Sequence, residues 1–131
     1  MRLSQASDFA MRILMLLERQ ESPMTVEMIS SELRLVHSHV MKIVAKLVKA
    51  GFLNSTRGRS GGVSLGQDAE AISVGDIVKA MEPDFAIVEC MRDAKSECVF
   101  ADACKLRNVF NTAKYSFLKE LDQHTLASLV N

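Results

Sequence analysis

The sequence lacks the features that mark membrane proteins and common enzymes. Its longest purely apolar run near the N-terminus covers residues 13–17, far short of the roughly 20 residues that cross a bilayer. Asp8 and Arg12 interrupt the only stretch that could imitate an export signal, so we expect a cytoplasmic protein with no membrane partner. There is no P-loop, no dinucleotide fingerprint and no Ser/His/Asp constellation, which argues against an enzyme.

The chain also has few prolines and no formal net charge. Two prolines and 24% charged residues among 131 argue against a disordered chain, and 48% hydrophobic residues suffice for one packed core. Basic and acidic residues balance at 16 each, but they are unevenly distributed. Residues 1–66 carry nine basic and five acidic side chains, and residues 67–131 carry seven and eleven. We therefore expect only the N-terminal half to contact a polyanion.

Apolar residues recur every three or four positions along most of the chain, which is the period of an amphipathic helix. This pattern predicts helices over residues 4–19, 25–33, 37–50, 73–81, 103–121 and 125–130. Between residues 52 and 65, two strand-like pieces flank a basic, glycine-rich tip, which predicts a β-hairpin. The expected fold class is mainly α with a small β-hairpin wing, and residues 1–83 have the element order of a winged helix-turn-helix.

The expected helix 37–50 carries the physical argument for DNA binding. One side is apolar and holds it on the domain, while the other side is polar and basic, as a helix in the major groove requires. Lys46 and Lys49, near the end of this helix, are positioned to contact DNA phosphates. Arg57 and Arg59 of the tip could enter the adjacent minor groove or bind the DNA backbone. Backbone N–H groups of the tip are further candidates for anion contacts. The predicted surface for double-stranded DNA comprises Ser38, His39, Lys42, Lys46, Lys49, Arg57, Arg59, Ser60, Gly61 and Gly62.

Two plainer interpretations apply to the same residues. A lysine stripe on one amphipathic helix is commonly a solvated face, and a glycine-rich tip is commonly a turn. The chain has a helix, a turn, a basic helix and a basic wing in that order. This combination favours DNA binding more strongly than either feature does alone. His37 and His39 are two residues apart and do not share a helix face, so they are poor candidates for metal ligands.

The three cysteines, Cys90, Cys98 and Cys104, fall in a segment without sustained periodicity. A reducing compartment and an odd number argue against a structural disulfide. Their spacing is not the paired C-x-x-C of zinc ribbons, and wide gaps suit an iron–sulfur cluster, which is larger than one ion and prefers thiolates. Acidic neighbours in the sequence do not favour thiolates. Three reduced cysteines without a role, or a zinc site of three cysteines plus His124, are the alternatives.

Along nearly its whole length the chain resembles the NsrR and IscR group of bacterial iron–sulfur winged-helix regulators. The matching segments are Met1–Leu3 with Asp8–Ala10, Val40–Ile43 with Lys49–Gly51, the wing Arg57–Gly66, Gly75–Val78 with Met81–Pro83, the three-cysteine loop, and Phe117–Asp122 with Thr125–Ala127. Their order along the chain makes the set specific.

The resemblance implies a homodimer held by the long C-terminal helix, with two recognition helices on a palindromic operator. It implies a cluster bound by the three cysteines, 4Fe–4S in the nitric-oxide-sensing branch, with 2Fe–2S as the smaller alternative. In that branch the fourth ligand is an N-terminal aspartate of the partner subunit, a position matched by Asp8. The IscR branch uses a histidine three residues after the last cysteine, where this chain has Arg107.

These assignments divide the chain into a winged helix-turn-helix DNA-binding domain (residues 1–83), a cysteine-containing cluster-binding loop (84–104), and a dimerisation helix with a C-terminal segment (105–131). The expected protein is a repressor that releases its operator when nitric oxide attacks the cluster. The wide first cysteine gap is shared with iron-responsive, RirA-like regulators, which makes iron sensing the alternative. Asp8 also has a plainer interpretation, a first-turn carboxylate paired with Arg12. A small electron-transfer protein would have four cysteines and no basic helix, so that class is disfavoured.

Overall fold

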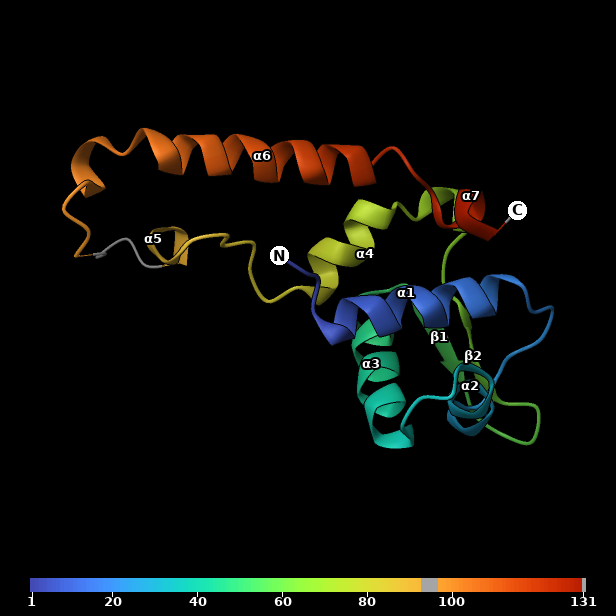
Figure 1. Cartoon of the computed structure of the whole chain (residues 1–131). Coiled ribbons are helices and arrows are strands. Elements are labelled where there is room, and N and C mark those ends of the chain that lie inside the picture. Colours follow the sequence, from blue (N-terminus) through green and yellow to red (C-terminus); the bar gives the residue numbers. More distant parts are fainter. Residues whose placement is uncertain (93–96, 131) are drawn as a thin grey trace.

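The computed structural model describes residues 1–92 and 97–130, so residues 93–96 of the expected cysteine loop lie outside it. Its elements are α1 (Gln5–Glu18), α2 (Val26–Leu33), α3 (His37–Lys49), β1 (Leu53–Thr56), β2 (Gly62–Leu65), α4 (Val74–Met81), α5 (Glu89–Arg92), α6 (Lys105–Leu121) and α7 (Leu126–Val130), with 3₁₀ turns at Ala69–Ala71 and Ala101–Ala103. The expected fold class, mainly α with a two-stranded wing, is confirmed (Figure 1).

Helix starts follow from side-chain caps that the sequence signals locally. Ser4, Thr25 and Ser73 precede α1, α2 and α4, and each side-chain oxygen accepts a hydrogen bond from a backbone N–H of the first turn. Such a cap satisfies one of the donors that a helix N-terminus leaves unpaired. The predicted boundaries of these helices are therefore correct to within a residue or two.

The turn between α2 and α3 is tight because Arg34 adopts a left-handed conformation with φ 53°. This conformation ends α2, and the Leu35 N–H then donates to the Ser30 carbonyl over 2.9 Å. α3 begins two residues later, after Val36, which gives no side-chain cap. The first three helices thus form the helix-turn-helix that the sequence predicts.

The wing is an antiparallel pair in which Leu53 lies opposite Leu65 and Thr56 opposite Gly62. Met24 pairs with Val63 as an isolated bridge, with two backbone hydrogen bonds of 3.0 and 2.8 Å. A Cβ at position 62 would lie 2.5 Å from the Met24 carbonyl oxygen, and Gly62 has φ 146°. Glycine at this position is therefore required for the wing to reach the segment between α1 and α2.

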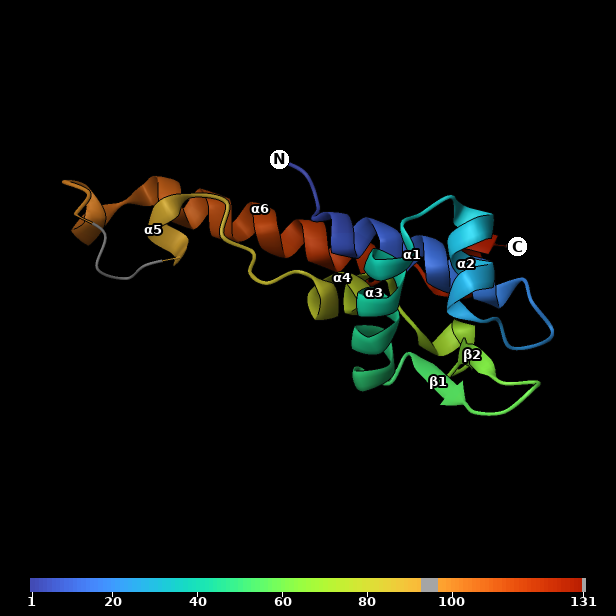
Figure 2. The ribbon, with the colours of Figure 1, turned by 90° about the horizontal axis from the view of Figure 1, so that it is seen from below.

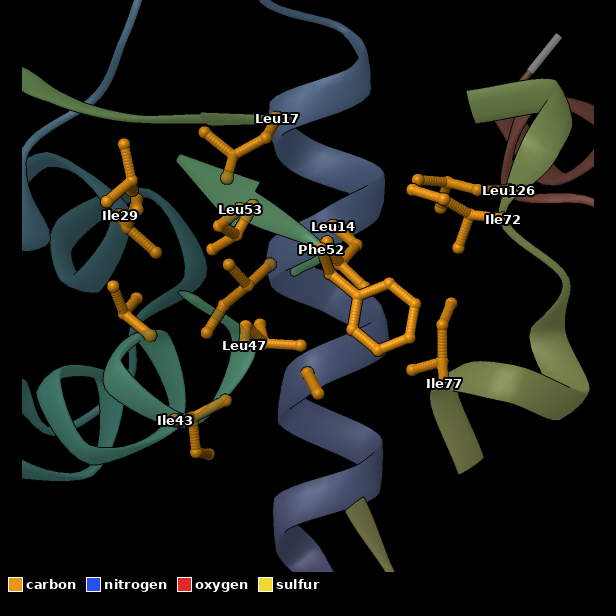
Figure 3. Packing of buried hydrophobic residues seen from close by; sticks show 14 of the residues in the cluster. Leu14, Leu17, Ile29, Ile43, Leu47, Phe52, Leu53, Ile72, Ile77 and Leu126 are labelled. Carbon is orange, nitrogen blue, oxygen red and sulfur yellow. The ribbon is translucent and has the colours of Figure 1, made fainter. Parts of the chain in front are cut away.

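One hydrophobic core holds the N-terminal elements and α7 together, as Figure 3 shows. Leu14 of α1 and Leu47 of α3 are fully enclosed, and Ile77 joins them from α4. Leu126 of α7 also belongs to this core, and its N–H donates to the Ile72 carbonyl over 2.8 Å. The C-terminal helix α7 therefore packs into the core of the winged-helix domain.

The other described residues form an arm, namely residues 83–92 and 97–121, that runs out through α5 and returns along α6 (Figures 1 and 2). No described side chain between residues 82 and 125 is buried. α6 meets the domain near its C-terminal end, where Lys79 of α4 forms an ion pair with Asp122 over 2.7 Å. Gly75 allows this approach, because a Cβ there would collide with the Asp122 side chain. Within the described residues, no helix is long and apolar enough to cross a membrane.

Candidate DNA-binding face and cysteine hollow

α3 divides its side chains as its sequence predicts. Its buried residues are Val40, Ile43, Val44 and Leu47. The predicted DNA-contacting residues on this helix are all exposed, and these are Ser38, His39, Lys42, Lys46 and Lys49. Packing therefore fixes one side of α3 against the domain and leaves the basic side open, which is the arrangement a groove-reading helix needs.

Lys46 differs from the other two lysines of this face. Its Nζ donates to the Met81 carbonyl at the end of α4 over 2.9 Å. In the part of the chain that the structure describes, Lys42 and Lys49 have no ion-pair or hydrogen-bond partner. Contact of Lys46 with a DNA phosphate would thus replace an existing hydrogen bond, whereas Lys42 and Lys49 are available as they stand.

The two histidines at the start of α3 pack against neighbouring helices. His37 Nε2 lies 3.2 Å from the Glu27 carboxylate of α2. The pKa of Glu27 is lowered first by a backbone N–H bond and then by hydrogen bonds from His37 and Thr25. The ring of His39 lies 6.5 Å from the ring of Phe9 in α1. Both histidines therefore have a contact with a neighbouring helix in this structure.

The wing tip presents its charged residues to solvent. Arg57, Arg59 and Ser60 are exposed beside the two strands. The N–H of Gly61 donates to the Gly58 carbonyl over 3.0 Å and closes the turn. The Gly61 N–H is therefore occupied within the tip, so the arginines are the stronger candidates for a phosphate or groove contact.

The predicted DNA-binding surface of α3 contains only polar and basic residues, and it leaves out two residues that the structure exposes on the same side. Met41 is 51% exposed, and Ala45, one turn later, is exposed as well. The signal in the sequence is their position between lysines on the side of the helix that the buried series leaves free.

The three cysteines line one hollow of about 430 Å³ at the far end of α6. Cys90 comes from α5, Cys98 from the following loop, and Cys104 is the N-cap of α6. The Cys104 sulfur accepts a hydrogen bond from the Arg107 N–H at 3.4 Å. Segments up to 14 positions apart thus bring all three sulfur-bearing residues to one place, although no three candidate ligands among the described residues are grouped tightly enough for one metal ion.

Two basic residues line the hollow, in addition to the acidic residues that neighbour the cysteines in the sequence. Among the side chains that the structure describes, the charged ones in the lining are Lys105 and Arg107, and the rest of the lining besides the cysteines is apolar. A cation beside a thiolate stabilises the negative sulfur. Three thiols, an apolar wall and two cations around a space larger than one ion fit the donor set of an iron–sulfur cluster.

The zinc alternative with His124 in the same chain is wrong. His124 follows the C-terminal end of α6, whereas Cys104 precedes its N-terminal end. A helix of 17 residues separates its ends by about 25 Å. The His124 ring instead lies 3.5 Å from the Glu120 carboxylate.

Asp8 is paired within its own helix. Its carboxylate accepts from Arg12 Nε at 3.1 Å and lies 2.8 Å from the second Arg12 nitrogen. Asp8 does not line the hollow of its own chain. The plainer interpretation of Asp8 therefore describes this structure, and a ligand role toward a second subunit stays a prediction.

Where the arm leaves the domain, Glu82 forms a polar junction with α1. Local sequence patterns did not indicate this junction. Glu82 accepts a hydrogen bond from the Ser4 N–H at 2.7 Å and another from the Ser7 hydroxyl. Burial alone would raise the pKa of Glu82, but the hydrogen bonds from Ser7 and Ser4 and the nearby Lys46 charge outweigh it, so the pKa lies below its usual value. Because Lys46 binds the neighbouring Met81 carbonyl, this junction joins α1, α3 and α4.

Comparison with known proteins agrees with this architecture. The sequence profile of the Rrf2 family, described as an iron-dependent transcriptional regulator, matches residues 3–131. The HTH-type transcriptional regulator NsrR of Bacillus subtilis (strain 168) is 36% identical over 132 residues, which cover 99% of this chain and 90% of that protein. The protein of the same name from Bacillus licheniformis is 33% identical, with 99% and 92% covered.

Solved structures share the fold at lower identity. A structure of CymR (YrzC), the global cysteine regulator of B. subtilis, superposes with a TM-score of 0.77 and 24% identity, covering 99% of this chain and 96% of that one. The T. potens IscR structure gives a TM-score of 0.80 at 23% identity, covering 99% and 86%.

Proposed function

Because the chain belongs to the Rrf2 family of iron-dependent transcriptional regulators, we propose that it is a homodimeric repressor that senses nitric oxide through an iron–sulfur cluster. In this proposal the cluster is 4Fe–4S, with 2Fe–2S as the smaller alternative, and the repressor leaves a palindromic operator when nitric oxide reacts. The observation that carries the proposal is the common hollow lined by Cys90, Cys98 and Cys104.

The residues of the hollow have separate roles in this proposal. The three cysteines hold the cluster, and the partner subunit's Asp8 provides the remaining ligand. When bound, the cluster supplies iron that reacts with nitric oxide. Lys105 and Arg107 offset the negative charge of the thiolates, and the apolar lining limits access of water.

Asp8 can exchange partners at little cost. Its side chain and that of Arg12 are 45% and 52% exposed, and an ion pair of this kind contributes about 0–1 kcal/mol. Asp8 can therefore leave Arg12 to bind the cluster of the partner subunit, and it can return to Arg12 when that bond breaks. Arg12 provides the resting place of the carboxylate.

The exposed apolar stripe of α6 supports a dimer. Leu106 and Val109 are 60% and 61% exposed on this helix, and burying such side chains against a second copy is favourable by the hydrophobic effect. A two-fold axis then places two α3 helices in major grooves about 34–36 Å apart, which corresponds to a palindromic operator.

The Glu82 junction supports a route from α1 to α3. Glu82 binds the first turn of α1 through Ser4 and Ser7, one position before Asp8, and the adjacent Met81 carbonyl binds Lys46 of α3. Displacement of the start of α1 would therefore be passed to the recognition helix. A small change in the spacing of two such helices costs contacts in both half-sites at once.

The test uses anaerobically purified protein. We expect a brown dimer containing iron and sulfide, which binds a selected palindromic duplex and releases it when nitric oxide is added. A colourless zinc protein, or equal DNA binding by the apo, cluster-loaded and nitric-oxide-treated forms, contradicts the proposal. Asp8→Ala should weaken the nitric oxide response and keep the fold, while Glu18→Ala, at the other end of α1, should leave both unchanged.

Iron sensing is the second candidate, because the family description names iron dependence. In that case an iron chelator alone would release DNA and restored iron would recover binding, whereas a nitric oxide sensor would stay bound to DNA in the presence of the chelator until nitric oxide is added. The two treatments, applied to the same preparation, separate the candidates.

A further inference from the structure

Met41 is an apolar side chain placed among groups that suit a polyanion. It is 51% exposed on α3 and is not among the side chains packed against the core. Ser38 precedes it by three positions and Ala45 follows by four, so the three form one row along the helix. Lys42 adjoins this row and is exposed as well.

A single exposed hydrophobic residue requires no explanation by itself, so the argument depends on its surroundings. Lys42 and Lys49, with no partner in the described residues, make the outward side of α3 a surface that attracts phosphates. A second copy of this chain that met it through the same face of α3, as a two-fold axis there would require, would bring like charges together. Duplex DNA is the occupant that fits both the charge and the shape of a single exposed helix.

The apolar group that the major groove offers to such a side chain is the C5-methyl of thymine. A methionine is unbranched and flexible, so its terminal methyl can adapt to a methyl group at the groove floor. Neither serine nor lysine of the same face has an equivalent apolar end. On the proposed DNA-binding role, we infer that Met41 is a specificity-determining residue which contacts a thymine methyl group in each half-site.

The experiment removes that methyl group and nothing else. The tightest palindrome is first selected from randomised duplex DNA, and each thymine in a half-site is then replaced singly, with its symmetry mate, by deoxyuridine. Burial of one methyl group corresponds to about fourfold in affinity. We expect one thymine position at which wild-type protein loses about fourfold per half-site, or about fifteenfold for the symmetric pair.

Met41→Ala should bind more weakly and lose this sensitivity to deoxyuridine at that position. Met28→Ala is the matched control, because Met28 is also 51% exposed but lies on α2, and it should retain the full effect. Comparison of both variants on both duplexes cancels any change in DNA shape that deoxyuridine causes. Thermal unfolding of the two variants checks that each is folded.

Two results overturn the inference while leaving DNA binding intact. One is a wild-type protein that binds specifically but is indifferent to deoxyuridine at every thymine. The other is Met41→Ala that loses as much affinity on deoxyuridine as wild type does. If no duplex is selected at all, the proposed function fails, and this inference fails with it.

Discussion

The winged-helix domain and the arm are built on opposite principles. The buried hydrophobic residues lie in residues 10–81 and in α7, where one core joins all the elements. In the arm, no described side chain is buried, and apolar residues such as Leu106 and Val109 face solvent. The domain therefore buries most of its hydrophobic residues within one chain, whereas those of the arm stay exposed in the single chain.

On the proposed function, this difference gives the domain the rigidity to read DNA and leaves the response to a signal to the arm. A packed interior transmits displacement between its elements. A segment with few buried contacts is the part of a protein that opens or rearranges at low free-energy cost. Four sets of substitutions test this contrast.

The largest effect is expected for Val109→Glu in the arm. If a second copy covers the α6 stripe, two unpaired charges are buried in each dimer, at about 3–5 kcal/mol for each. Sedimentation equilibrium should show monomers, with weakened binding to a palindrome. Tyr115→Glu is the control, since Tyr115 is 67% exposed and lies on the opposite side of α6, so it should remain dimeric. A Val109→Glu dimer would mean that the stripe is not the subunit interface.

Truncation of a leucine in each region measures the contrast directly. Leu14→Ala empties a fully buried position, and such changes lower the free energy of unfolding by about 2–5 kcal/mol. Leu106→Ala makes the same change at a position that is 60% exposed in the chain, and within one subunit it should cost less than about 0.5 kcal/mol. Urea unfolding at one protein concentration, with sedimentation to separate the dimer contribution, gives both values. Equal losses would show that the arm has a core of its own.

A smaller effect is expected at the boundary between the regions. Glu82→Gln removes the charge that accepts from Ser4 and Ser7, and hydrogen bonds to charged groups contribute about 1.5–3 kcal/mol. Because folding lowers the pKa of Glu82 below 4.5, the carboxylate stabilises the fold above that pH, and the stabilisation disappears as pH falls through the folded-state pKa.

The measurement is the difference in unfolding free energy between wild type and Glu82→Gln as a function of pH. The difference should be constant near neutrality and shrink below pH 4.5. The exposed Glu21→Gln should give a difference near zero throughout. A difference for Glu82→Gln that grows on acidification would contradict the lowered pKa of this carboxyl group.

The smallest effect concerns the first turn of α6. Cys104 accepts the Arg107 N–H as a cap, and serine caps a helix whereas alanine does not, a contrast of about 1 kcal/mol. Cys104→Ser and Cys104→Ala should both lose bound iron, but only the alanine variant should show faster hydrogen exchange at the Arg107 amide. Equal exchange in both would show that the sulfur has no part in starting the helix.

The helices of the domain could be predicted from the sequence because they depend on patterns among neighbouring residues. The apolar series of α3 and the caps Thr25 and Ser73 are short-range features, and they predicted element type and position correctly. The start of α6 was placed at Ala103 by periodicity, whereas the structure has a 3₁₀ turn there and begins α6 at Lys105. That difference arises because a capping cysteine is an uncommon signal.

Contacts between distant segments were not predictable from local patterns. Glu82 meets Ser4 across 78 positions, and Lys46 meets Met81 across 35. Cysteine spacing indicated a shared cluster, in agreement with the one hollow that the cysteines line, but it did not reveal that His124 lies at the other end of α6. The sequence has acidic residues near the cysteines, but the described charged residues that line the hollow are Lys105 and Arg107.

The long helix of the arm has a mechanical consequence. Near its C-terminal end, α6 is fastened to the domain by the polar Lys79–Asp122 contact and the close approach at Gly75. Over a length of about 25 Å, a tilt of about 10° at that joint carries the opposite tip through about 4 Å. Conversely, an ångström-scale rearrangement around the cysteines reaches the domain as a rotation of a few degrees, so the geometry acts as a reducing lever between the two ends of the molecule.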